Sequence, residues 1–210
     1  MFITFEGGEG SGKSTQAARL AARLRESGRE VLLTREPGGT AFGEVARTLV
    51  LHHAIDAGAE PVRLDDTAEL LLFGAARAQH LDELIRPALA RGAIVLCDRF
   101  ADSTVAYQGY GRGLPMQRVL QSVELATSGT LPDRTVLLDL PVEEGLRRRF
   151  RERPPDQIER QDTAFHARVR DGFLARAAAE PQRFIIVNAT RTVPEIAAEI
   201  WTRLAALGEG

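Results

Sequence analysis

The chain opens with Met1-Phe-Ile-Thr-Phe-Glu-Gly-Gly-Glu-Gly-Ser-Gly-Lys-Ser-Thr15, in which an apolar strand leads into Gly7-x-x-x-x-Gly12-Lys13-Ser14 and then into a helical pattern. This order is the context in which such a motif indicates a phosphate-binding loop, or P-loop. Glycine tolerates positive φ and has no side chain, so the backbone can approach a phosphate closely. The backbone N–H groups at the helix N-terminus then form an anion-binding concavity. A glycine-rich turn with a chance Lys-Ser pair is the alternative, and the four glycines and the flanking pattern disfavour it.

Phosphoryl transfer requires positioned phosphates, a metal and neutralised charge. Lys13 would reach the β- and γ-phosphates, and the Ser14 hydroxyl would ligate Mg²⁺. The acidic group near the metal should end a strand close to the loop, and Asp98 and Asp139 both follow apolar runs. We favour Asp98 because Arg99 follows it at once. Asp139 has the appearance of a Walker-B carboxylate, but it is also placed to cap the next helix.

Composition limits the class of protein. The 210 residues fit one domain spanning 1–210, and the shares of 44% apolar and 27% charged residues are those of a soluble globular protein. The net charge of −2 argues against a nucleic acid partner. Cys97, the only cysteine, excludes an intramolecular disulfide and is interpreted as a buried apolar residue. No run approaches a membrane span and the N-terminus does not resemble a signal peptide, so we expect a cytoplasmic protein without a membrane partner.

Short β-type runs alternate with longer helical patterns, which predicts an α/β fold: a parallel sheet with helices on both faces. Five strands are expected, at Phe2–Phe5, Glu30–Thr34, Ile94–Cys97, Thr135–Leu140 and Phe184–Val187. The first helix begins at the P-loop and stops at Gly28. Further helices are expected at Phe42–Leu51, Thr67–Arg91, Met116–Ser128, Val142–Arg153, Thr163–Ala179 and Pro194–Leu207. Pro87 is expected to kink or interrupt the pattern at Thr67–Arg91.

The segment Asp98-Arg99-Phe100 is followed by the stretch from Ala101 to Gly113, which mixes aromatic, polar and flexible residues and is interpreted as a loop. Ligand sites in open α/β sheets lie beyond the carboxyl ends of the strands. A single arginine on a loop is usually a solvated charge, but Arg99 directly follows an apolar strand that should end near the nucleotide. We therefore expect Arg99 to bind a phosphate.

Two further segments are candidates for ligand binding, and the first of them should reach the same rim. Arg35-Glu-Pro-Gly-Gly-Thr40 follows the second strand, although it also fits an ordinary Pro-Gly turn. Phe73 and Arg77 are four residues apart and would share a helix face, where a ring and a guanidinium suit a stacked base. On their own, these two residues are more typical of a core Phe beside a surface Arg. His52 and His53 are interpreted as solvated loop residues.

An arginine cluster occupies Arg147-Arg-Arg-Phe-Arg-Glu-Arg153, followed by Pro-Pro-Asp-Gln-Ile-Glu-Arg160. Such a run fits a solvated helical face. It fits equally a lid at about 147–162 that brings guanidinium groups over the transferring phosphoryl group, where a closing arginine can contribute about 10³–10⁵ in rate. Both interpretations remain open, and each can hold for different arginines.

Taken together, the motifs resemble the bacterial thymidylate kinase family from about Phe2 to the C-terminal helix. The segments that carry the resemblance are Gly7–Ser14, Arg35–Thr40, Phe73-x-x-x-Arg77, Asp98-Arg-Phe-x-x-Ser-Thr-x-Ala-Tyr-Gln108 and Val136–Asp139. The block from Asp98 to Gln108 is the most specific of them. The resemblance implies the reaction ATP + dTMP → ADP + dTDP with Mg²⁺. It also implies a three-layer fold of the P-loop NTPase type with a five-stranded parallel sheet, and a homodimer.

The resemblance also implies roles for individual residues. Those expected around the ATP phosphates are Gly7, Gly8, Glu9, Gly10, Ser11, Gly12, Lys13, Ser14 and Thr15. Those expected around dTMP are Glu9, Arg35, Phe73, Arg77, Arg99, Ser103, Thr104, Tyr107 and Gln108. Phe73 would stack on thymine and Arg77 would bind its edge. Tyr107 would lie under the sugar, and Glu9 near the 3′-hydroxyl. Arg99 would hold the dTMP phosphate, and Ser14 with Asp98 would hold the metal. The Glu36-Pro37 bond is a candidate for the cis form.

Catalytic roles are implied for Lys13, Asp98, Arg99 and an arginine of the lid. This chain has Glu9-Gly10-Ser11 in its P-loop and no arginine there, so it resembles the members that supply the catalytic arginine from the lid. The arginine usual in the lid is replaced by Gln157. We take Arg153 first, with three alternatives: Arg149, Arg151 and Arg160.

Two other functions remain possible at this point. A kinase for another pyrimidine monophosphate, dUMP or UMP, differs only in a pocket whose shape the sequence does not show. A nucleotide-gated binding module would keep the P-loop but transfer nothing to dTMP. The density of motifs on the acceptor side favours an enzyme.

Overall fold

The computed structural model describes residues 1–52, 64–151 and 155–205. Five parallel strands form one sheet in the order β2-β3-β1-β4-β5. Their bounds are Phe2–Glu6 for β1, Val31–Arg35 for β2, Ile94–Asp98 for β3, Arg134–Asp139 for β4 and Phe184–Asn188 for β5. Every strand is where the sequence predicts it, within one residue at each end. Uninterrupted apolar runs are typical of strands covered on both faces, which is why the prediction succeeds.

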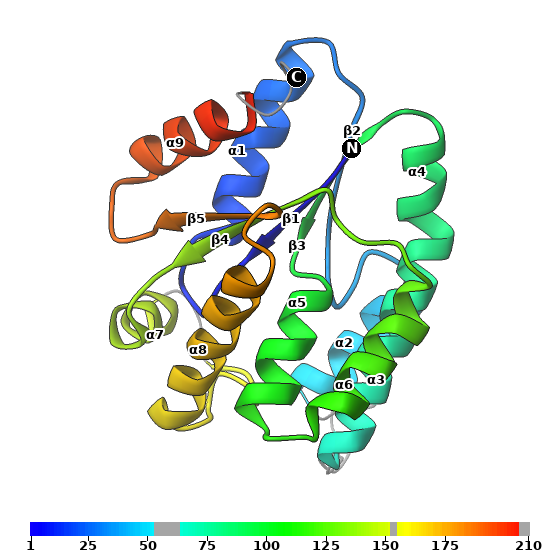
Figure 1. Cartoon of the computed structure of the whole chain (residues 1–210), viewed down its shortest axis with the longest axis vertical. Helices are drawn as coiled ribbons and strands as arrows, with labels where there is room; N and C mark the ends of the chain where they lie inside the picture. The colour runs from blue at the N-terminus through cyan, green and yellow to red at the C-terminus, as the bar shows by residue number, and fades with distance from the viewer. Residues whose placement is uncertain (53–63, 152–154, 206–210) are drawn as a thin grey trace.

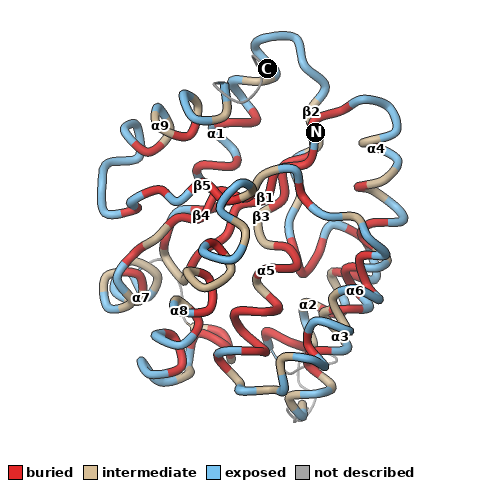
Figure 2. The backbone as a smooth tube through the Cα atoms, viewed as in Figure 1, coloured by how far each residue is buried: buried red, intermediate tan, exposed pale blue. Residues whose placement is uncertain are grey.

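Helices cover both faces of the sheet (Figure 1). Helix α1 (Lys13–Glu26) packs with α9 (Val193–Ala205) on one face, in a cluster that includes Phe5, Leu96 and Leu138 of the strands. The remaining α-helices are α2 (Ala41–His52), α3 (Asp66–His80), α4 (Arg86–Ala90), α5 (Ala101–Thr104), α6 (Met116–Thr127), α7 (Val142–Phe150) and α8 (Thr163–Ala179). Figure 2 shows the central strands β1, β3 and β4 buried along most of their length between these layers. No helix among the described residues is both long and apolar enough to span a membrane.

The segment after β3 differs from the prediction. The stretch interpreted as a loop is helical: α5 continues into a π-helix at Val105–Gly111. This π-helix packs against α8, and Gly111 lies so close that a Cβ there would be 2.7 Å from the ring of Phe165. Tertiary packing thus makes a helix from a stretch whose glycines and aromatics locally favour a loop.

The long pattern at Thr67–Arg91 is interrupted as expected, but before the proline rather than at it. A π-helical turn at Leu81–Ile85 joins α3 to α4, and Pro87 lies in the first turn of α4. Proline has no N–H for the i→i−4 ladder, and a widened turn is one way to absorb that loss.

The register of the sheet brings the site together. Asp98 at the end of β3 pairs with Phe5 of β1 and with Arg35 of β2. The last residues of the three strands, and the segments that follow them, therefore meet at one edge. This is the edge at which open α/β sheets bind their ligands.

Candidate active site

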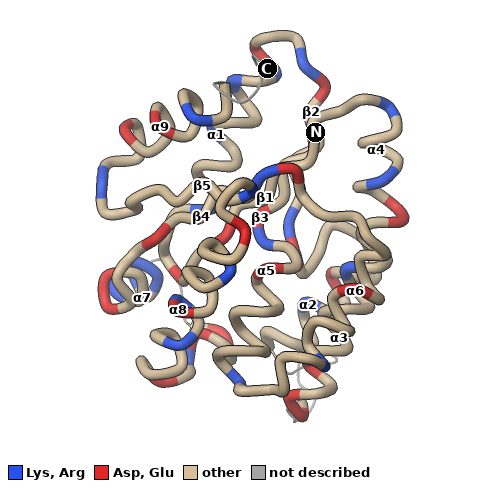
Figure 3. The backbone as a smooth tube through the Cα atoms, viewed as in Figure 1, with Lys and Arg blue, Asp and Glu red and all other residues tan. Residues whose placement is uncertain are grey.

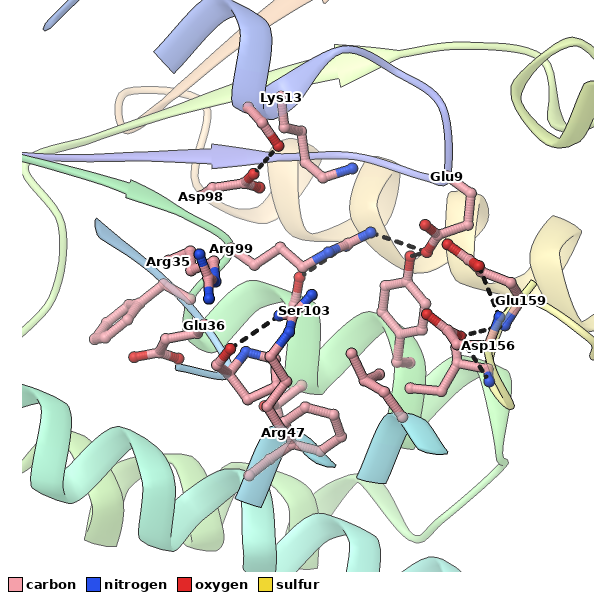
Figure 4. A pocket seen from close by; sticks show the side chains of 18 of the residues that line it. Glu9, Lys13, Arg35, Glu36, Arg47, Asp98, Arg99, Ser103, Asp156 and Glu159 are labelled. Carbon is pink, nitrogen blue, oxygen red and sulfur yellow. Dashed lines mark hydrogen bonds and ion pairs between the residues drawn. The ribbon is translucent and has the colours of Figure 1, made fainter. Parts of the chain in front are cut away.

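A cavity of about 380 Å³ lies at this edge and is lined from both sides. One wall belongs to the P-loop and the start of α1, and the other to residues of α3, β3, α5 and the following π-helix. Figure 4 shows Arg99 extending across it toward Glu9, with Lys13 and Asp98 on one side and Arg47 on the other. Of the residues expected around ATP and dTMP, all but Gly7, Gly8 and Ser11 line this cavity, and so does Asp98.

The P-loop has the backbone that its glycines permit. Gly7 has φ 140°, and a Cβ at Gly10 would lie 2.2 Å from the carbonyl oxygen of Gly145 in α7, so neither position accepts a side chain. Lys13 Nζ donates to the carbonyl of Gly8 at 2.7 Å, and Ser11 Oγ donates to the same oxygen at 2.8 Å. Burial, reinforced by the charge of Arg99, lowers the pKa of Lys13 to about 8. An ammonium with so little water around it is poised to gain a negatively charged partner.

Ser14 and Asp98 come together although 84 positions separate them. The Ser14 hydroxyl donates to Oδ2 of Asp98. A hydroxyl and a carboxylate oxygen on the cavity wall are the ligands that Mg²⁺ prefers, so this pair fits the expected metal site. Asp139, the other candidate, fits neither of its expected roles. Its carboxylate is bound by Arg170 of α8 at 2.7 and 2.9 Å, because α8 packs against β4.

Arg99 is held in place by the P-loop itself. Its Nη2 donates to Oε1 of Glu9 at 2.9 Å and its Nη1 to the carbonyl of Gly7 at 3.1 Å. Tyr107 also donates to Oε1 of Glu9, at 2.5 Å, and its ring centroid lies 4.9 Å from the guanidinium carbon of Arg99. Burial by itself would raise the pKa of Glu9, but Arg99 and Lys13 outweigh it and hold that pKa at about 2.

A second buried carboxylate, Glu6, was not expected from the sequence. It is the last residue of β1, fully buried, and it accepts hydrogen bonds from the N–H of Phe100 at 2.7 Å and from Ser103 Oγ at 2.6 Å. Burial, reinforced by the charge of Asp102, raises the pKa of Glu6 to about 8. These bonds hold the segment that follows Arg99, whose φ is 71°. A Glu before a glycine-rich loop carries no sequence signal for this role.

Arg77 is buried, so the interpretation of a core Phe beside a surface Arg is wrong. Only 2% of its side chain is exposed. Its Nε donates to Glu36 at 2.9 Å and its Nη2 to the carbonyl of Phe100 at 3.1 Å. His80 holds the other oxygen of Glu36 at 3.0 Å. The Glu36-Pro37 bond is cis, as expected.

Phe73, Thr104 and Gln108 line the same cavity as Arg77. Gln108 is 1% exposed, and its Nε2 donates to Glu69 of α3 at 2.8 Å. Glu69 had no predicted role, since an acidic residue in a helix usually faces water. An aromatic ring, a guanidinium and an amide around one cavity can hold a planar heterocycle by stacking and by its edge.

Arg35 lines the cavity but is bound to Glu44 of α2 at 2.9 and 3.1 Å, with about half of its side chain exposed. Arg47, which sequence reasoning missed, lines the same cavity and donates to the carbonyl of Pro37 at 3.0 Å. No sequence motif marks Arg47, because it reaches the cavity only through the packing of α2 against α3.

His52 is the exposed last residue of α2 rather than a loop residue, and His53 lies outside the described residues.

The arginines of the cluster at 147–153 differ in their surroundings: some lie on a solvated helical face, and one lies at the cavity. Figure 3 shows both signs of charge gathered at α7, where Arg147 and Arg148 pair with Glu144. Arg149 lines the cavity instead, with its Nε 2.6 Å from Glu159. Two of the other candidates do not line it: Arg151 is exposed and Arg160 donates to the carbonyl of Pro155. Arg153 lies outside the described residues.

The segment that follows the cluster, residues 155–160, forms a turn beside the cavity. Asp156 accepts from the N–H groups of Ile158 and Glu159, both at 3.0 Å, and Glu159 accepts from the N–H of Asp156 at 2.9 Å. Ile158 is buried in the same apolar cluster as Leu51. Burial raises the pKa of Asp156 and of Glu159. The turn is thus a compact unit that carries two carboxylates to the cavity wall, as Figure 4 shows.

Comparison with known proteins gives one consistent result. A family model described as thymidylate kinase matches residues 5–200. The thymidylate kinase of Deinococcus radiodurans is 50% identical over 208 residues, which cover 99% of this chain and 98% of that protein. That of Synechococcus sp. strain JA-3-3Ab is 52% identical over 202 residues, covering 96% and 94%. A crystal structure of thymidylate kinase from Ehrlichia chaffeensis matches with a TM-score of 0.77 and 38% identity, covering 97% of this chain and 98% of that one.

Proposed function

The chain belongs to the thymidylate kinase family and is a kinase that uses ATP to phosphorylate dTMP to dTDP, and from this premise we propose which side chains carry the reaction. One observation supports the assignment above the others. The P-loop and the group formed by Phe73, Arg77 and Gln108 line a single cavity. Two nucleotides can therefore meet with their phosphates between Lys13 and Arg99.

On the donor side, the P-loop backbone and Lys13 bind the ATP phosphates. Lys13 then exchanges its bond to the Gly8 carbonyl for the β- and γ-phosphates. Ser14 and Asp98 hold Mg²⁺, which neutralises phosphate charge when bound. Their mutual contact supports this, because a cation between the two side chains would meet an oxygen of each.

On the acceptor side, Arg99 binds the dTMP phosphate while Phe73 stacks on the base and Arg77 binds its edge. Arg35 and Arg47 add positive charge to the same cavity. Tyr107 and Glu9 lie at the level of the sugar. The phosphate that attacks is already anionic at pH 7, so no protein base is required. Catalysis then rests on positioning and electrostatic stabilisation.

We assign the closing arginine to Arg149, in place of the first expectation, Arg153. Among the described arginines of the 147–162 segment, Arg149 is the one that lines the cavity, and Glu159 orients it through Nε. This bond keeps the guanidinium at the cavity wall, where the transferring phosphoryl group would meet it. Segment 147–162 would act as the lid of a single domain.

The assignment is tested by coupled turnover with ATP and dTMP, dUMP, UMP, CMP or AMP as acceptor. We expect dTMP to give the highest kcat/KM. An equal or higher kcat/KM for another acceptor contradicts the assignment of dTMP as the substrate. A methyl group in a pocket contributes about 1–3 kcal/mol, so dUMP is the most demanding competitor. ATP binding without dTMP-dependent ADP release would favour the binding module.

We propose that the enzyme works as a homodimer. Leu71 of α3 is exposed, as are Leu120 and Leu125 of the adjacent α6, the last by 81%. Large exposed apolar side chains on packed helices support contact with a second copy. Sedimentation equilibrium tests this: Leu125→Glu should shift the mass toward that of a monomer, and a monomeric native protein contradicts the proposal.

A further inference from the structure

The amide of Gln108 can turn either of two chemically different groups toward the cavity. Its oxygen accepts a hydrogen bond and its nitrogen donates two. Because Gln108 is 1% exposed, the amide has few partners from which to choose. Which group faces a bound base therefore depends on what the other group bonds to.

Glu69 decides that orientation. Its carboxylate is 4% exposed and is paired with Arg112, whose Nη2 lies 2.9 Å from Oε2. The other oxygen, Oε1, receives the Nε2 of Gln108 at 2.8 Å. A carboxylate only accepts hydrogen bonds, so the amide nitrogen must face Glu69 and the amide oxygen must face away from it.

The guanidinium of the neighbouring Arg77 is also held by hydrogen bonds, and it has a donor to offer where Gln108 has an acceptor. Glu36 and the Phe100 carbonyl occupy its Nε and Nη2. Its Nη1 is buried and has no hydrogen-bond partner among the residues that the structure describes. Gln108 and Arg77 both line the cavity, so Gln108 Oε1 would offer a ligand there an acceptor and Arg77 Nη1 would offer it a donor.

We propose that Glu69 is a specificity-determining positioning residue: by locking the Gln108 amide, it makes the site select a 4-oxo over a 4-amino pyrimidine. This inference rests on the proposed function, since it assumes that the base lies between Phe73 and these two residues. A 4-oxo pyrimidine has a donor at N3–H and an acceptor at O4, which match Gln108 Oε1 and Arg77 Nη1. A 4-amino pyrimidine has an acceptor at N3 and a donor at the amino group, which oppose both.

The test compares dTMP with 5-methyl-dCMP, which keeps the methyl group and differs at the 4-position and N3. The discrimination factor is the ratio of their kcat/KM values. Glu69→Gln keeps the size of the side chain but allows the partner to donate, so the Gln108 amide can turn over. We expect the factor to fall about tenfold, with the KM for dTMP raised and kcat at saturation nearly unchanged. Arg77 still opposes the amino group, so the discrimination is reduced rather than lost.

Asp66→Asn is the matched control. Asp66 lies one helical turn before Glu69 and also pairs with Arg112, at 3.4 Å, but it does not bond to Gln108. This variant should keep the native factor. A folded Glu69→Gln protein with the native factor overturns the proposal, as does an equal fall in Asp66→Asn.

A double variant keeps the proposal testable if the single one does not fold. Glu69→Gln with Gln108→Glu exchanges the two groups at constant charge and size, and puts an acceptor-only carboxylate on the cavity side. The double variant should have the same discrimination factor as the native enzyme. A lower factor in the folded double variant overturns the proposal. Failure of the proposed function is separate, because it would appear in the native enzyme as absent turnover or a preference for 5-methyl-dCMP.

Discussion

The guanidinium of Arg99 binds the carboxylate of Glu9 with 2.9 Å between Nη2 and Oε1, across 90 positions of sequence. The two motifs that would hold different nucleotides are thereby joined directly. The bond orients the guanidinium toward the P-loop, and Ser103 Oγ lies 3.2 Å from its Nη1. These bonds fix the Arg99 guanidinium at the cavity wall, where the proposed function places the phosphate of dTMP.

Arg99→Lys should raise the KM for dTMP much more than the KM for ATP. The lysine keeps the charge but not the planar fork that reaches Glu9, Gly7 and a phosphate at once. Initial rates with each substrate varied in turn provide the measurement. Equal changes in both KM values would show that Arg99 does not belong to the dTMP side.

Lys13→Ala should lower kcat by about 10²–10³-fold and leave the protein folded. The substitution removes the ammonium expected at the transferring phosphoryl group. Turnover and far-UV circular dichroism are compared with those of Arg19→Ala, an exposed residue of the same helix. Unchanged turnover would be incompatible with the role of the P-loop.

Arg149→Ala should lower kcat by about 10³-fold while changing dTMP affinity little, because a closing arginine acts on the transition state. Arg147→Ala is the control, since Arg147 pairs with Glu144 and is half exposed. The measurement is kcat beside a dissociation constant for dTMP from calorimetry. If Arg151→Ala or Arg160→Ala produced the loss instead, the lid assignment would be wrong.

Glu9 should stabilise the fold above pH 4.5 and lose this effect at lower pH. Its pKa is about 2 in the folded protein, below the ordinary value of 4.5 for a glutamate, so the folded state binds fewer protons in this interval. As pH falls from 5 to 3, the native protein should lose more free energy of unfolding than Glu9→Gln. Urea titrations at several pH values measure this, and parallel curves for the two proteins would refute it.

Glu6 should have the opposite dependence. Its pKa of about 8 lies above the ordinary 4.5, so the folded state holds a proton that the unfolded state releases. The contribution to stability is full below pH 4.5 and declines as pH rises toward 8. Relative to Glu6→Gln, the native protein should lose thermal stability between pH 5 and 8. Glu26→Gln, on the exposed side of α1, should follow the native curve.

Local sequence patterns were sufficient to predict the strands of the sheet and some of the residues that line the cavity. The strands were predicted to within one residue because each is an apolar run bounded by turn residues. Lys13, Ser14 and Asp98 were predicted to lie at the same edge because each occupies a fixed place relative to a strand end, and the structure places all three on the cavity wall. The helix after Phe100 was missed, since its conformation depends on burial against α8 rather than on propensity.

The residues that sequence reasoning missed share one property. Glu6, Glu69 and Arg47 are charged side chains without a motif, of the type that usually faces solvent. Their roles come from partners distant in sequence: Phe100 and Ser103 for Glu6, Gln108 and Arg112 for Glu69. Asp139 is the opposite case. It occupies a position typical of a motif, but its carboxylate forms an ion pair with Arg170.

The amino-acid sequence by itself determined the succession of strands and helices, the P-loop and the family, since these depend on spacing along the chain. Only the tertiary structure decided which charges are buried and paired: the hydrogen bonds of Glu6, the bond from Arg99 to Glu9, and the orientation of the Gln108 amide. The reason is physical. Burial and electrostatic pairing depend on distance in space, and the parallel crossovers of the sheet bring together residues that sequence spacing leaves unrelated.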